Sequence, residues 1–109
     1  MFKEYGYLCD THTAVAVGVY NKYKAETGDG KPAVIASTAS PYKFADSVLK
    51  AVTDKKTDSE LGNVRLLSEV TSTEIPAPLL ALENAEVRFK EICEKDKMLD
   101  AVYAALKIK

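Results

Sequence analysis

The chain has 109 residues, enough for one domain, and its apolar (47%) and charged (28%) fractions are those of a globular protein rather than a disordered tail. The formal net charge of −1 gives no electrostatic reason to expect nucleic acid or an anionic membrane as a partner. No apolar run reaches the roughly 20 residues that span a bilayer, and the first five residues lack the apolar core of a signal peptide. We therefore expect a cytoplasmic protein with reduced cysteines, Cys9 and Cys93.

The first elements in chain order are two helices. Residues 2–5 look like the last turn of a helix that ends at Gly6, which suggests that the chain is a fragment and that Met1 is not a natural start. Asp10 is a good N-cap for a second helix, expected from Thr11 to about Glu26 and followed by a loop with two glycines.

The first half of this second helix, Ala14 to Val19, is apolar on every face. A helix of that kind must be covered all round, and a chain this short would struggle to surround it. Gly18 costs about 1 kcal/mol relative to alanine inside a helix, so we expect it to permit the close approach of another element.

A strand and a helix are predicted next. Residues 33–36 (Ala-Val-Ile-Ala) form a continuous apolar run, typical of a strand buried on both faces. Ser40 can cap the following helix and Pro41 suits its first position. Phe44, Val48 and Val52 then recur at four-residue spacing, which predicts an amphipathic helix.

The remainder of the chain predicts two further helices, a strand and a last helix. Thr57 to Glu60 has the form of a capping box for a helix to about Val70, and a proline-containing connector leads to a short helix over 79–83. Residues 87–92 alternate apolar with polar, which predicts an edge strand, and a final amphipathic helix carries Met98, Val102 and Leu106. Strands alternating with helices predict the α/β class.

Three hydroxyl residues would lie at the carboxyl end of the predicted strand 33–36: Ser37, Thr38 and Ser40. In open α/β sheets, ligands bind beyond the carboxyl ends of strands, next to helix amino termini. The same hydroxyls are also what a simple cap and turn require. The pattern alone leaves a binding site and a structural turn open, and favours the turn.

Other catalytic and metal constellations are weak. His12, the only histidine, follows Cys9 by three residues, but no oxyanion site is evident, so nucleophilic catalysis is not expected. Cys9, His12 and Cys93 lack the spacing of a zinc site, and no metal site is predicted. Gly28 and Gly30 follow a helix, the reverse of a phosphate-binding loop.

Two segments resemble those of a known family. Gly6-Tyr-Leu-Cys-Asp-Thr-His-Thr-Ala-Val15 resembles the G-Y-x-x-D-P-H-T-A-V segment of threonine synthase, and Ser37-Thr-Ala-Ser-Pro-Tyr-Lys-Phe44 resembles its T-A-x-P-x-K-F segment. They occur in the family's order and spacing. Ile75-Pro76, followed by residues 79–82 and 87–89 and a closing amphipathic helix, also looks like that enzyme's carboxyl terminus. This chain departs from the pattern at Thr11, where proline is usual, and at Ser40, where histidine is frequent.

The resemblance implies an enzyme that uses pyridoxal 5′-phosphate to convert O-phospho-L-homoserine and water to L-threonine and phosphate. It implies the fold of the tryptophan synthase β-subunit, with helices around a short, mostly parallel sheet. It also implies that Thr38 donates its hydroxyl to the pyridine nitrogen of the cofactor, and more weakly that His12 lies near the cofactor. Thr38 would then sit at the mouth of a buried strand.

The resemblance further implies what residues 1–109 leave out. The lysine that forms the Schiff base, the phosphate-binding loop and most of the substrate site lie upstream in the family. We therefore expect a single carboxyl-terminal segment that has no catalytic residue of its own, is inactive alone, and has the rest of the threonine synthase chain as its partner.

Two alternatives from other classes remain open at this point. One is a stand-alone small α/β interaction or regulatory domain that has kept the packing without the chemistry. The other is a different pyridoxal phosphate enzyme of the same fold, such as a serine or threonine dehydratase, against which the D-x-H-T-A segment argues.

Overall fold

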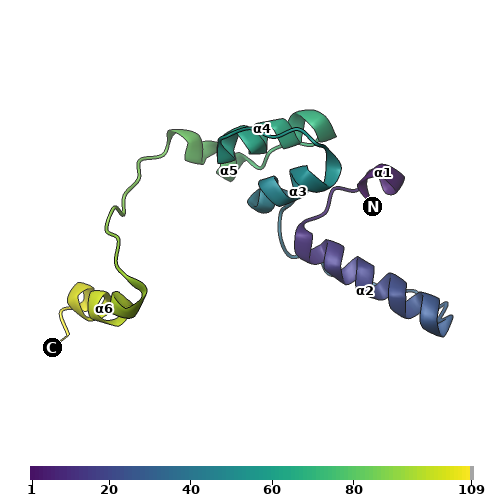
Figure 1. Ribbon diagram of the computed structural model, residues 1–109, viewed down its shortest axis with the longest axis horizontal. Helices are drawn as coiled ribbons and strands as arrows, with labels where there is room; N and C mark the ends of the chain where they lie inside the picture. Colours follow the sequence, from purple (N-terminus) through teal and green to yellow (C-terminus); the bar gives the residue numbers. More distant parts are fainter. Residues whose placement is uncertain (109) are drawn as a thin grey trace.

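The computed structural model describes residues 1–108, and the ordered elements in them are all helical (Figure 1). Six α-helices follow one another along the chain: α1 (Phe2–Tyr5), α2 (Thr11–Thr27), α3 (Ala45–Val52), α4 (Glu60–Thr71), α5 (Ala77–Ala81) and α6 (Met98–Leu106). Three 3₁₀ turns precede or extend them: η1 (Pro41–Phe44), η2 (Leu82–Asn84) and η3 (Lys95–Lys97).

Local capping explains where most helices begin and end, and confirms the predicted helices. Gly6 (φ 67°) and Gly28 (φ 68°) end α1 and α2 in the left-handed conformation that glycine adopts without strain. Ser40 accepts a hydrogen bond from the Tyr42 amide at the start of η1, as predicted. Helix α4 begins later than expected, because Ser59 is its cap and the Thr57 side chain instead contacts Asn63.

The core lies between α3 and α4. It consists of the buried side chains of Tyr42, Ala45, Val48, Leu49, Val64 and Leu67. Leu49 (1% exposed) and Leu67 (0% exposed) are at its centre. The Tyr42 hydroxyl lies 2.9 Å from the carbonyl oxygen of Thr73, to which it donates, so the segment after α4 is held against η1. The amphipathic spacing of residues 44–52 therefore did predict a core-facing helix.

The predicted α/β fold with a short, mostly parallel sheet is wrong for this chain. Neither of the predicted strands, 33–36 and 87–92, is present among the described residues. A strand exists only where a neighbour pairs with its backbone amides and carbonyls, and these two segments lie apart in Figure 1. Their side chains are solvated instead: Val34 is 98% exposed and Ile92 is 97% exposed.

The described chain is extended rather than compact. Its radius of gyration is 19.5 Å, whereas a compact domain of this length has about 13 Å. Figure 1 shows α2 projecting from the α3–α4 core and α6 lying beyond a long linker on the other side. Apolar residues of both helices are exposed, among them Val15, Val19, Met98, Leu99, Val102 and Leu106. The cover expected around the apolar half of α2 is thus not supplied by residues 1–108, and no atom lies near the position of a Cβ on Gly18.

The core assignment predicts a large effect of truncating Leu67. Leu67→Ala should lower the free energy of unfolding by about 2–5 kcal/mol, because it removes buried methyl groups and leaves a cavity between α3 and α4. The matched change Leu82→Ala, at a side chain that is 59% exposed, should cost no more than about 0.5 kcal/mol. Urea unfolding followed by circular dichroism measures both, and equal losses would contradict the core described here.

Candidate functional site

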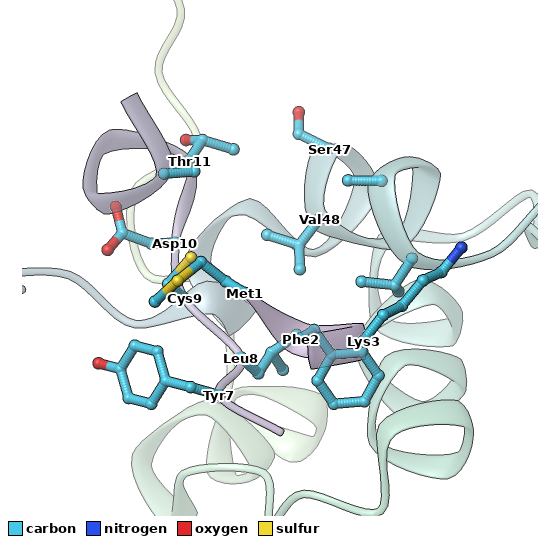
Figure 2. Close-up of a pocket in the computed structure, with 13 residues that line it drawn as sticks. Met1, Phe2, Lys3, Tyr7, Leu8, Cys9, Asp10, Thr11, Ser47 and Val48 are labelled. Atoms are coloured by element: carbon cyan, nitrogen blue, oxygen red, sulfur yellow. The ribbon is translucent and has the colours of Figure 1, made fainter. Parts of the chain in front are cut away.

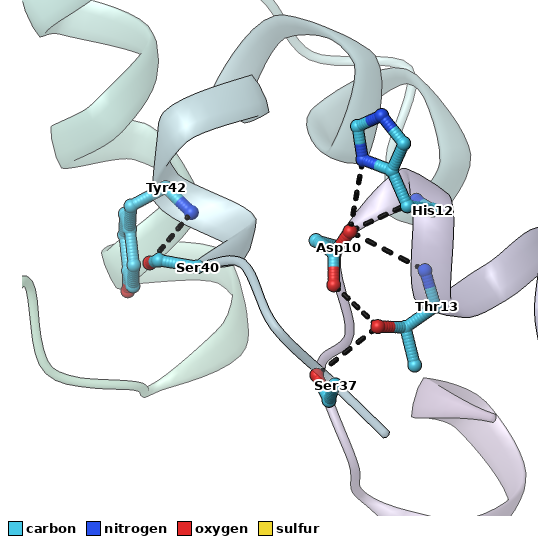
Figure 3. Close-up of polar contacts among 6 residues, drawn as sticks. All are labelled: Asp10, His12, Thr13, Ser37, Ser40 and Tyr42. Carbon is cyan, nitrogen blue, oxygen red and sulfur yellow. Dashed lines mark hydrogen bonds and ion pairs between the residues drawn. The ribbon is translucent and has the colours of Figure 1, made fainter. Parts of the chain in front are cut away.

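The carboxylate of Asp10 organises the amino terminus of α2 (Figure 3). Asp10 is 1% exposed and caps the helix. Its Oδ1 accepts hydrogen bonds from the backbone amides of His12 (2.9 Å) and Thr13 (3.3 Å), and its Oδ2 accepts one from the Thr13 hydroxyl (2.5 Å). A buried carboxylate is tolerable only with partners of this kind, so the chain is fixed at this point.

Thr13 connects this cap to the second motif segment. Its Oγ1 lies 3.0 Å from Oγ of Ser37. A threonine hydroxyl has one proton, and a carboxylate only accepts. Because the Thr13 proton is used on Asp10, the Ser37 hydroxyl must donate to Thr13. The three side chains form a directed series from Ser37 to Thr13 to Asp10, which ties residues 6–15 to residues 37–44.

His12 is the second side chain held by Asp10. Its Nδ1 lies 3.2 Å from Oδ1 of Asp10, and its ring meets the ring of Phe44 edge-on, with centroids 4.9 Å apart. The side chain is nevertheless 71% exposed. The imidazole is therefore oriented by contacts from both motif segments while one side of it faces solvent.

Thr38 lies next to Ser37 but not at the end of a strand. The segment from 31 to 38 has no regular secondary structure, and Thr38 is exposed. The expected position at the mouth of a buried strand is therefore wrong, because no neighbouring strand is present within residues 1–108. The hydroxyl remains accessible, and the Thr13–Ser37 contact fixes the backbone beside it. Ser40, two residues further on, caps η1.

The hydrogen bonds at Asp10 change its acidity. The Thr13 hydroxyl is the largest influence, and together with the amides of His12 and Thr13 it lowers the pKa of Asp10 from 3.8 to about 2, against the opposing effect of burial. Asp10 is consequently ionised at every pH near neutrality, and it acts only as an acceptor there.

A hollow of about 370 Å³ opens beside the cap, between the first eleven residues and α3 (Figure 2). It is lined by Met1, Phe2, Lys3, Tyr7, Leu8, Cys9, Asp10, Thr11, Ala14, Ser47, Val48, Ala51 and Val52. The lining is mostly apolar and includes the free thiol of Cys9. The other cysteine, Cys93, is also a free thiol but lies outside this hollow. Among residues 1–108 no group of three metal-ligating side chains is found.

The sequence singled out some residues of this site and missed others. Asp10 and Ser40 were predicted as caps, and the structure confirms both. The cofactor contacts of His12 and Thr38 stay predictions. Thr13 and Phe44 were not assigned to a site. The contact of Thr13 with Ser37, 24 positions away, and the ring contact of Phe44 with His12 reveal their place, and no local pattern carries such a signal.

Comparison with known proteins gives the family. The sequence model of the family described as "Threonine synthase, C-terminal" matches residues 13–106. The chain therefore belongs to the threonine synthase C-terminal family, in agreement with the resemblance of its two motif segments. This membership links it to threonine biosynthesis. Among the curated proteins and the solved structures, no match to the chain was found.

Within residues 1–108, no helix is both long and apolar enough to cross a bilayer.

The lowered pKa of Asp10 predicts acid sensitivity of this site. The folded state holds fewer protons than the unfolded state between pH 3.8 and about 2, so the contribution of Asp10 is complete above that window and is lost as the pH falls through it. Far-ultraviolet circular dichroism of α2 during acid titration should show this loss. Asp10→Asn should be less stable at neutral pH and should lack this part of the acid transition. An unchanged transition in the variant would contradict the role of the carboxylate.

Proposed function

We propose that this chain is the carboxyl-terminal part of a pyridoxal phosphate-dependent threonine synthase, which converts O-phospho-L-homoserine and water to L-threonine and phosphate. The family match over residues 13–106 is the observation that carries the proposal. The Thr13–Ser37 hydrogen bond and the His12–Phe44 ring contact support it, because they bring together residues 6–15 and 37–44, the two segments that resemble the family.

One residue of this chain, Thr38, is suited to contact the cofactor. Thr38 offers an exposed hydroxyl on a segment that Ser37 anchors, which suits a neutral hydrogen bond to a ring nitrogen. Pyridoxal phosphate supplies an electron sink when it is bound. A neutral hydroxyl leaves the ring nitrogen largely unprotonated, which weakens the electron withdrawal by the ring. The role of Thr38 is therefore to orient the ring and to limit this electron withdrawal. The lysine that binds the cofactor and the groups that hold its phosphate belong, on this proposal, to the rest of the enzyme.

The rest of the enzyme is also the partner that we propose for the exposed apolar helices. Val15 and Val19 of α2 are 66% and 62% exposed, and the apolar residues of α6 are similarly solvated. Exposed apolar area of this extent is typical of an interaction surface. A stand-alone domain is less well supported, because within residues 1–108 the apolar side chains of α2 and α6 lie outside the α3–α4 core. A cytoplasmic location stays a prediction from the sequence.

The proposal predicts a specific loss on removing one hydroxyl. In the complete enzyme that contains this chain, Thr38→Val should lower kcat by up to about tenfold, because one hydrogen bond contributes about 0.5–1.5 kcal/mol and 1.4 kcal/mol is tenfold. The unfolding midpoint should change little, since the side chain is exposed. Phosphate release from O-phospho-L-homoserine and the absorption spectrum of the bound cofactor measure the effect.

The conservative variant is the control for this experiment. Thr38→Ser retains the hydroxyl and should recover most of the rate and the wild-type spectrum. If Thr38→Val and Thr38→Ser behave alike in both measurements, the hydroxyl does not contact the cofactor.

If the rest of the enzyme covers α2, a charge on the covered face should lower the stability of the complete enzyme but not that of this chain alone. Val19→Asp should change the stability of this chain alone by no more than about 0.5 kcal/mol, because Val19 is exposed. In the complete enzyme it should bury an unpaired charge and cost about 3 kcal/mol or more, seen as a lower unfolding midpoint. Asn21→Asp adds the same charge on the far side of α2 and should be tolerated in both. Tolerance of Val19→Asp in the enzyme would show that this face is not covered.

A further inference from the structure

The Asp10 carboxylate contacts the Thr13 hydroxyl and the His12 ring with different oxygens. Oδ2 accepts from the Thr13 hydroxyl at 2.5 Å, whereas Oδ1 faces Nδ1 of His12 at 3.2 Å as well as two backbone amides. The carboxylate therefore has a further contact besides those that cap the helix. One of its oxygens is shared with an imidazole that is 71% exposed.

The contact fixes which ring nitrogen of His12 carries the proton. A neutral imidazole has one N–H donor and one bare acceptor nitrogen, and the hydrogen bond made by one nitrogen sets the state of the other. An ionised carboxylate cannot donate. In the neutral ring, Nδ1 must therefore hold the proton that Asp10 accepts, and Nε2 is then bare.

The ring is also oriented from the second motif segment. Phe44 meets it edge-on at 4.9 Å with an interplanar angle of 63°. Figure 3 shows the Asp10 contact on the side of the imidazole that faces the start of α2 and the opposite nitrogen pointing away from it. The exposed imidazole thus has both its tautomer and its direction set by residues of segments 6–15 and 37–44.

We propose that Asp10 is a positioning residue that holds His12 as its Nδ1–H tautomer and presents a bare Nε2 as a hydrogen-bond acceptor in the assembled enzyme. This inference rests on the proposed function for its catalytic meaning, but the tautomer belongs to this chain. His12 would accept an O–H or N–H of the substrate there, and Asp10 would act only through it.

The tautomer can be measured directly, because His12 is the only histidine. Two-bond ¹⁵N correlation spectra of this chain at alkaline pH should show a protonated Nδ1 and an unprotonated Nε2. Asp10→Ser keeps a capping oxygen but has no negative charge, and its spectrum should shift toward the Nε2–H tautomer. A wild-type spectrum with the proton on Nε2 would overturn the proposal.

Thr13→Val is the matched control. It removes the hydrogen bond to Oδ2 and leaves the contact of Oδ1 with His12, so it should lower stability without changing the tautomer. If Thr13→Val shifts the tautomer as far as Asp10→Ser, then the effect of Asp10 is only structural and the proposal fails.

Kinetics of the complete enzyme test the catalytic meaning. Asp10→Ser and His12→Ala should each lower kcat by about tenfold, the size of one hydrogen bond, and the double variant should lose no more than either alone. The role of His12 would be overturned if the loss of kcat in the double variant were the product of the two single losses. An unchanged rate in His12→Ala would also overturn it. A wild-type enzyme without activity on O-phospho-L-homoserine would instead refute the proposed function and leave the tautomer result standing.

Discussion

The buried carboxylate of Asp10 is the interaction on which the arrangement of the two motif segments depends. It satisfies the first amides of α2, orients His12, and through Thr13 reaches Ser37. Removing the carboxylate oxygens would leave these donors without an acceptor, which costs more than the hydrogen bonds themselves contribute. The position of Thr38 follows from this network, since Ser37 fixes the backbone next to it.

A second constraint is the amount of apolar surface that the chain leaves in water. The buried residues of its core lie in η1, α3 and α4, with Leu8, Ile75 and Leu79 packed against them, while α2 and α6 extend away (Figure 1). An apolar side chain gains stability when it is buried, by roughly 1.5–3 kcal/mol if burial is complete, so these helices are suited to packing against another surface. Membership of the threonine synthase C-terminal family makes the remainder of such an enzyme the partner that we propose for them.

The helices could be predicted from the sequence and the sheet could not, for a physical reason. Caps such as Asp10, Ser40 and Gly28 act within a few residues of their own position, and so a local pattern is sufficient. The alternation of residues 87–92 records only that one face is apolar; a strand also needs a neighbour, and residues 1–108 provide none. The same holds for the site: Asp10 was predicted as a cap, but its connection to Ser37 requires a contact between distant segments. Thr38 was singled out by its place after the predicted strand 33–36, which is absent, and its cofactor role, like that of His12, came from the family resemblance.

The most direct test of the central claim is an assay with O-phospho-L-homoserine as substrate. The complete enzyme that contains this chain should form threonine and phosphate in equal amounts, and only when pyridoxal phosphate is bound, whereas residues 1–109 alone should form neither. Phosphate release by the isolated chain would contradict the account. So would a complete enzyme that leaves O-phospho-L-homoserine unchanged and breaks down threonine instead, as a dehydratase does.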